Sequence, residues 1–262
     1  MRLAALILAA TFCAAQTLTI TTRLPIDGAA AYRSFQEWRR QPAHSALNWE
    51  QAISQYRRKL ASEGLSTAAV DRTLRIIEAR DEATLYDPAY AGPPKFDTRP
   101  NALLVEAVAN RKPGTALDVG MGQGRNALHL ARKGWKVTGF DVASEGLAQA
   151  HKQAGIEGLT LETAHASDEE FNFGTNRWDL IAIIYPIEKR SVFRVARALK
   201  AGGLVVTECA HKDAGGAPFE YGDNELLNIF KGFLVLKYED TVAMHDWARK
   251  PMRLVRLIAQ KR

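Results

Sequence analysis

The sequence predicts an α/β protein with a doubly wound, mostly parallel sheet and a helical extension in front of it. From about residue 100 onward, short apolar runs alternate with amphipathic helical stretches. Residues 116–119 are apolar apart from one acid, which is typical of a buried parallel strand. Three alternating glycines and a helical pattern follow at once, so this segment has the strand–turn–helix order of a βα unit.

The same alternation continues to the C-terminus. The elements expected after the glycines are a strand at 137–141, a helix at 144–153, strands at 158–163 and 178–184, a helix at 188–199, a strand at 204–209 and two C-terminal strands at 233–243 and 252–259. Because the last two are joined by a loop around Lys250-Pro251, they predict an antiparallel hairpin at the end of the sheet.

We divide the chain into a signal peptide at 1–15, a helical N-terminal cap region at 16–99 and a sheet domain at 100–262. Three amphipathic stretches, near 29–40, 49–60 and 66–77, predict helices in the cap region. Ser66 is the expected N-cap of the third. A short strand is expected at 17–22, and a loop at 86–95 because of its prolines and glycine.

The N-terminus resembles a secretory signal peptide. Arg2 precedes the apolar stretch 3–12, and small residues come before Gln16, where cleavage is expected. This predicts an extracytoplasmic protein, periplasmic or secreted, or a cytoplasmic one if the segment is a buried helix or follows a misassigned start and is not cleaved. No later segment is apolar enough to span a bilayer, so no stable membrane insertion is expected after removal of the signal.

Composition gives little support to a nucleic-acid partner. The 262 residues carry a net charge of +6, and the basic residues are dispersed. Arg39-Arg40 and Arg57-Arg58-Lys59 are the basic runs, and solvated helix faces account for both. The histidines show no metal-ligand spacing with cysteines or acids, so no metal site is expected.

The glycines at 120, 122 and 124 predict a site where a ligand lies against bare backbone. The next strand ends on Asp141, one βαβ step later, where a carboxylate can accept both hydroxyls of a ribose. A dinucleotide would fit the same geometry. Asp118, just before the first glycine, favours a cofactor with an ammonium group instead, because a carboxylate is unhelpful beside a pyrophosphate.

Residues 117–131 and 134–141 resemble the first two motifs of class I S-adenosylmethionine (SAM)-dependent methyltransferases. The sequence Gly124-Arg-Asn-Ala-Leu128 looks most like the branch that includes the tellurite-resistance and thiopurine methyltransferases. The resemblance implies a Rossmann-like seven-stranded methyltransferase sheet closed by the C-terminal hairpin, with SAM as the cofactor. It implies these cofactor-binding residues: Asp118, Gly120, Gly122, Gly124, Arg125, Asn126, Asp141 and Asp168. A solvated acidic turn that includes Glu169 and Glu170 explains Asp168 nearly as well.

The expected reaction is methyl transfer to a small-molecule acceptor: a thiol, an amine, a carboxylate or an oxyanion. Tyr185 and His211 are the candidate catalytic residues, because each follows a predicted central strand at its carboxyl end. Phe96, Arg99 and Asn101 are candidates for lining the cofactor site. An RNA or protein methyltransferase and a catalytically silent SAM-binding module remain alternatives. The sequence Ile184-Tyr-Pro-Ile187 lacks the tetrad of enzymes that methylate exocyclic base amines. A signal peptide would also separate the enzyme from cytosolic SAM.

Overall fold

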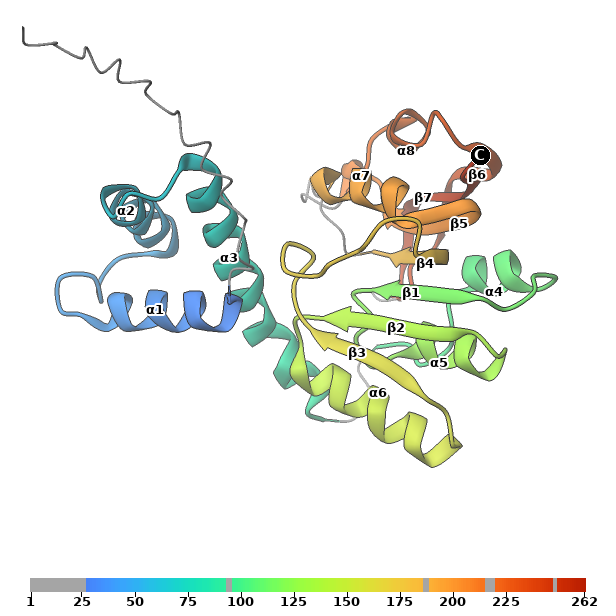
Figure 1. Ribbon diagram of the computed structural model, residues 1–262, viewed down its shortest axis with the longest axis horizontal. Coiled ribbons are helices and arrows are strands. Elements are labelled where there is room, and N and C mark those ends of the chain that lie inside the picture. The colour runs from blue at the N-terminus through green and yellow to red at the C-terminus, as the bar shows by residue number, and fades with distance from the viewer. Residues whose placement is uncertain (1–26, 93–95, 186–188, 215–219, 247–248) are drawn as a thin grey trace, which may run out of the picture.

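The computed structural model describes residues 27–92, 96–185, 189–214, 220–246 and 249–262 (Figure 1). Three helices come first, and a sheet flanked by helices follows. The predicted signal peptide and the predicted strand at 17–22 lie outside the described residues. In the described part of the chain, no helix combines the length and the apolar character that crossing a membrane requires.

The sheet has seven strands in the order β3-β2-β1-β4-β5-β7-β6. The strands are β1 (Thr115–Val119), β2 (Lys136–Asp141), β3 (Leu161–His165), β4 (Trp178–Ile184), β5 (Leu199–Ala210), β6 (Leu234–Met244) and β7 (Pro251–Gln260). β1 to β5 pair in parallel, and β7 is antiparallel to both β5 and β6. The predicted Rossmann-like methyltransferase sheet with a C-terminal hairpin is therefore confirmed.

Helices cover both faces of this sheet. They are α4 (Ala102–Val108), α5 (Arg125–Arg132), α6 (Ser144–Glu157), α7 (Lys189–Ala198) and α8 (Glu225–Ile229), with a short 3-10 turn, η1 (Lys212–Ala214). α4, α5 and α6 share one apolar cluster with Leu180 and Ala182 of β4. α7 and α8 share the other cluster with Ile181 and Ile183. Successive side chains of β4 point to opposite faces of the sheet, so each face has its own hydrophobic core.

The three N-terminal helices are α1 (Gly28–Arg40), α2 (Trp49–Ser62) and α3 (Thr67–Tyr90). Their apolar stripes meet in a third cluster, in which Phe35 packs edge-on against Tyr56 at a centroid distance of 5.0 Å. Ser66 caps α3 by accepting a hydrogen bond from the backbone amide of Ala69. In Figure 1, α3 runs from this helical unit towards the sheet and passes beside α6.

The predicted loop at 86–95 is wrong in its first half, because α3 continues through Pro88 to Tyr90. A proline inside a helix costs about 3 kcal/mol. Contacts with α6 offset this cost: the carboxylate of Asp87 accepts a hydrogen bond from the backbone amide of Glu145 at 3.0 Å. The Tyr90 carbonyl also accepts one from the side chain of Gln149.

Two ion pairs join α3 to the segment that follows β3. Arg75 binds Glu169 at 2.8 Å, and Arg80 binds Glu170 at 2.7 Å. Glu169 is 9 % exposed, so these two acids do not form the solvated turn that the sequence left open. Because both pairs are largely withdrawn from water, they tie the middle of α3 to the segment after β3.

Candidate active site

A cavity of about 510 Å³ lies at the carboxyl ends of the central strands. Residues that follow β1, β2 and β4 form its floor, at the point where the strand order reverses between β1 and β4. This is where open α/β sheets bind ligands. One face of α3 forms a wall, with Glu78, Glu82, Tyr86 and Tyr90 at intervals of one helical turn. The volume falls within the range of about 300–1,000 Å³ typical of small-molecule and cofactor sites.

The glycine turn after β1 forms one side of the cavity. Gly120, Gly122 and Gly124 have φ angles of 63°, 50° and 79°. Such angles favour glycine, and they leave bare backbone at Gly120 and Gly122, which line the cavity. Gly124 serves packing instead, because it is the N-cap of α5 and a Cβ there would lie 2.8 Å from the Cβ of Ala150.

Asp141 ends β2 and faces the same cavity. Its carboxylate accepts hydrogen bonds from the backbone amides of Gly122, at 2.7 Å, and Ala143, at 2.8 Å. A carboxylate has about four acceptor positions, so capacity remains for the hydroxyls of a ribose. Burial raises the pKa of Asp141, and the backbone amides oppose that rise.

Asp118 is not on the cavity surface, which corrects the expectation that it meets the cofactor directly. The side chain is 1 % exposed and accepts a hydrogen bond from the backbone amide of Ala127, in the first turn of α5, at 3.0 Å. It therefore supports the glycine turn from below. Burial raises the pKa of this carboxyl to about 7, against the opposing charge of Arg125.

Arg125 and Asn126 begin α5 and line the cavity. Arg125 forms an ion pair of 3.0 Å with Asp246, from the turn between β6 and β7. The Asn126 side chain accepts a hydrogen bond from the backbone amide of Asn101 at 2.9 Å. Both side chains thus connect the glycine turn to distant segments.

Asp168 lies on the cavity surface after β3, as predicted. Arg194 of α7 donates to its backbone carbonyl at 2.6 Å, and a guanidinium nitrogen of Arg194 lies 3.9 Å from its carboxylate. Of the three upstream candidates, Phe96 lines the cavity. Arg99 is an exposed partner of Asp97, and Asn101 is a buried helix cap.

Tyr185 lies on the cavity surface directly after β4, as predicted, with an unusual backbone φ of +79°. For a bulky residue such an angle is strained, so its surroundings must hold it in place. The hydroxyl donates to Glu208 at 2.5 Å and accepts from the backbone amide of Asp246 at 3.3 Å. Burial and the Glu208 charge raise the Tyr185 pKa. Because its hydroxyl is engaged by Glu208 and Asp246, Tyr185 contributes to the cavity mainly through its aromatic ring.

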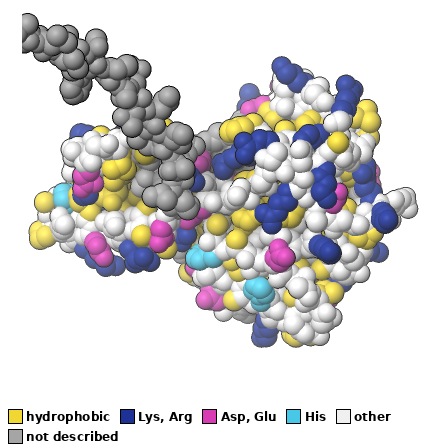
Figure 2. All heavy atoms as spheres, viewed as in Figure 1, with side chains coloured by type: hydrophobic (Ala, Val, Ile, Leu, Met, Phe, Trp, Pro, Cys, Tyr) yellow, Lys and Arg dark blue, Asp and Glu magenta, His cyan; other side chains and the backbone are white. Residues whose placement is uncertain are grey.

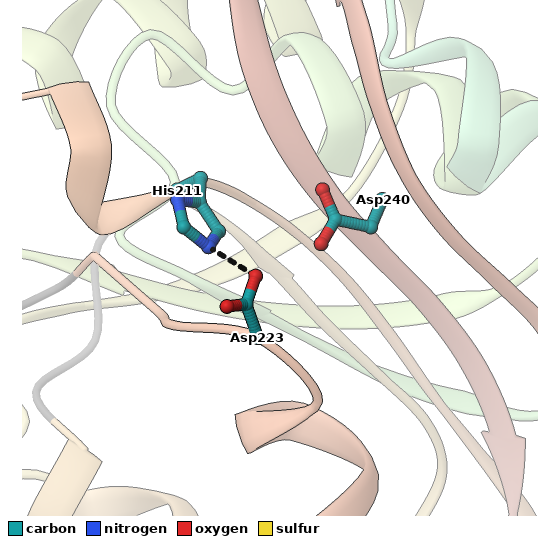
Figure 3. Close-up of side chains that lie close together, drawn as sticks. All are labelled: His211, Asp223 and Asp240. Atoms are coloured by element: carbon teal, nitrogen blue, oxygen red, sulfur yellow. Dashed lines mark hydrogen bonds and ion pairs between the residues drawn. The ribbon is translucent and has the colours of Figure 1, made fainter.

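His211 does not reach the cavity, which corrects its prediction as a catalytic residue. Ala210 lines the cavity, and side chains of an extended strand alternate, so the next residue faces the opposite side. There His211 lies 3.2 Å from Asp223, with Asp240 close by (Figure 3). It is 1 % exposed.

The side chains of His211, Asp223 and Asp240 lie close enough together to hold a metal ion. The guanidinium of Arg253, however, already provides the positive charge that balances the carboxylates. Arg253 binds Asp213 at 2.7 Å, Asp223 at 2.6 Å and Asp240 at 2.7 Å. We call His211, Asp213, Asp223, Asp240 and Arg253 the Arg253 cluster. A divalent ion would have to displace this arginine, so the cluster is a charge-compensated structural element on the reverse side of the sheet.

The structure instead places His245 in the cavity wall. It follows β6, is 4 % exposed, and stacks on Tyr185 with ring centroids 4.2 Å apart. A topological signal could have found it. β6 is antiparallel to β7 and β7 to β5, so β6 ends at the same edge of the sheet as the central strands.

The sheet order, the glycine turn and the acid that ends β2 define a class I SAM-dependent methyltransferase domain. A protein-family model described as "Methyltransferase domain" matches residues 116–203. The bare glycine backbone and the remaining acceptor capacity of Asp141 fit SAM, which this family implies as the cofactor.

Among similar proteins is the probable S-adenosyl-L-methionine-dependent methyltransferase TehB of Haemophilus influenzae. The two are 26% identical over 176 residues, which cover 61% of each chain. The chain thus spans about three fifths of this relative's length. The crystal structure of TehB from the same organism matches with a TM-score of 0.51 and 23% identity over 61% of each chain. The structure of the [4+2]-cyclase SpnF matches with a TM-score of 0.57 and 19% identity over 70% of this chain and 96% of that one.

Proposed function

We propose that this protein transfers the methyl group of SAM to a small-molecule acceptor. The observation that carries the proposal is a cavity that joins the glycine turn and Asp141 to a second group of side chains, Tyr185, His245 and Lys250. Cofactor and acceptor can therefore lie side by side in one space. When bound, SAM supplies an electrophilic methyl group, and the residues around it hold the reacting atoms in line.

Two features support a small acceptor over a nucleic acid. The cavity has a volume of about 510 Å³ and is walled by α3, so a polymer would have to enter past that helix. On the face seen in Figure 2, Lys and Arg side chains are scattered among hydrophobic and acidic ones. A protein that binds RNA through its backbone would be expected to gather them into a stripe.

The test is a transfer assay with methyl-labelled SAM and four classes of acceptor: thiols, amines, carboxylates and inorganic oxyanions, with total RNA as a fifth arm. Label on a small molecule supports the proposal, and label on RNA supports the macromolecular alternative. Since the cyclase SpnF has a similar fold, the fold does not by itself establish transfer. Tight calorimetric binding without transfer to any class would indicate a silent SAM-binding module.

A further inference from the structure

We propose that His245 is the catalytic base, which accepts the proton that a protic acceptor, a thiol or an amine, loses when it is methylated. The inference rests on the proposed methyl transfer and names the class of acceptor. Of the four acceptor classes, carboxylates and inorganic oxyanions present a nucleophile without a proton to remove.

Backbone hydrogen bonds hold His245 in the lining of the cavity. Its amide donates to the Lys250 carbonyl at 3.0 Å, and its carbonyl accepts from the Arg249 amide at 2.8 Å, so two backbone hydrogen bonds join His245 to the residues just before β7. The imidazole stacks on Tyr185 with an angle of 24° between the rings. Tyr185 is itself held by Glu208. The position of the imidazole is thus set by β4, β5 and the β6–β7 turn together.

Burial favours the neutral form of the His245 imidazole. Burial is the largest influence and lowers the His245 pKa, and Arg125 and Lys250 lower it further. Glu208 and Asp246 act in the opposite direction. Their charges are compensated, because Glu208 binds Arg256 at 2.6 Å and Asp246 binds Arg125 at 3.0 Å. A neutral imidazole can take up a proton, which a general base must do.

Three other candidate groups, on Tyr185, Asp246 and His211, are less suited to accepting this proton. The Tyr185 hydroxyl already donates to Glu208, and its raised pKa opposes ionisation. The Asp246 carboxylate accepts hydrogen bonds from Asn101, at 2.9 Å, and from Arg125. His211 belongs to the Arg253 cluster on the reverse side of the sheet.

The chemistry balances with no further reactant. For a thiol, the S–H proton passes to an imidazole nitrogen of His245 while the thiol sulfur forms the new bond to carbon. SAM becomes the neutral thioether, whose sulfur keeps the electron pair of the broken bond. The imidazolium then returns its proton to water, and the acceptor leaves as a methyl thioether.

The kinetic test compares two sulfur nucleophiles that differ in having a proton to lose. The probes are 2-mercaptoethanol, a thiol, and dimethyl sulfide, which carries no acidic proton. For His245→Gln we expect kcat with 2-mercaptoethanol to fall by about 100-fold or more, the usual contribution of a general base. With dimethyl sulfide we expect a change within about threefold. His211→Gln, which removes a buried histidine outside the cavity, is the control and should resemble the parent with both probes.

The second readout does not depend on turnover. In ¹H–¹³C NMR spectra, the imidazole signal missing from His245→Gln identifies His245. We expect that signal to titrate at a lower pH than an unperturbed histidine side chain, and to shift when 2-mercaptoethanol is added. The signal missing from His211→Gln should not shift.

Each result decides the matter. An equal loss with both probes would show that His245 is structural, and no loss with either would show that it is not the base; both outcomes overturn the inference. If the parent enzyme methylates neither probe, or dimethyl sulfide alone, the assignment of a small protic acceptor is also overturned. The transfer assay with the four acceptor classes separates the two failures. Transfer by the parent protein to any small acceptor preserves the proposed function when the inference fails, whereas no transfer to any class overturns the proposed function itself.

Discussion

Replacing Asp141 with alanine should weaken SAM binding by a predictable amount. The carboxylate ends β2, faces the cavity and already accepts two backbone amides. If the ribose lies where we propose, the loss of this carboxylate removes charged hydrogen bonds to the cofactor, each worth about 1.5–3 kcal/mol. At about 1.4 kcal/mol per factor of ten, loss of one such bond raises the SAM dissociation constant about 10- to 100-fold.

Isothermal titration calorimetry on the parent and three variants tests this value. Asp141→Asn keeps one acceptor oxygen, so its loss should lie between those of the parent and the alanine variant. Asp179→Ala is the matched control, because Asp179 lies near the start of β4, at the opposite edge of the sheet, where it pairs with Lys200 at 2.7 Å. Its SAM affinity should equal that of the parent.

A parent-like SAM affinity in Asp141→Ala would refute the placement of the ribose. The same conclusion would follow if Asp179→Ala lost as much affinity, because the effect would then reflect general weakening of the sheet. Tight binding of NAD by the parent protein would favour the dinucleotide interpretation that the glycine spacing alone allows.

Three further predictions concern the turn, its support and the N-terminus. Gly122→Val should abolish calorimetric SAM binding, because its φ of +50° disfavours valine and a Cβ would lie 2.3 Å from the Tyr90 hydroxyl; normal binding by a folded variant would contradict this. Asp118 has its pKa raised from 3.8 to about 7, so its native state binds an extra proton between these values and the protein loses stability as pH rises through them. In Asp118→Asn, whose amide oxygen can still accept from Ala127, the change in melting temperature between pH 5 and pH 8 should shrink, and an unchanged profile would show that Asp118 is ionised throughout. We propose that residues 1–15 direct export; N-terminal sequencing of the protein from its native host should find Gln16 first in the extracytoplasmic fraction, and an intact N-terminus in the cytosol would contradict export.

The cofactor half of the site follows from local sequence. A strand, a turn that needs positive φ and an acid at the end of the next strand are close in the chain, so their geometry is set by short-range steric rules. Gly120, Gly122 and Asp141 lie where this reasoning placed them. Asp118 was in the right segment, but only packing revealed that its carboxylate points beneath the turn towards Ala127.

The acceptor half required the tertiary structure. His211 and His245 each follow a strand that ends at the same edge of the sheet. Two features of the tertiary structure decide which of the two histidines faces the cavity: the register of β5 with β7, and the extended backbone that continues past Ala210. Neither feature can be deduced from the order of the residues alone. Likewise, Pro88 and Gly92 indicate a loop locally, while contacts with α6 extend α3 to Tyr90 and bring it to the cofactor side of the cavity. The sequence by itself determined the fold class and the cofactor turn, because these depend on short-range patterns. Long-range strand pairing and helix packing decided which side chains meet the acceptor.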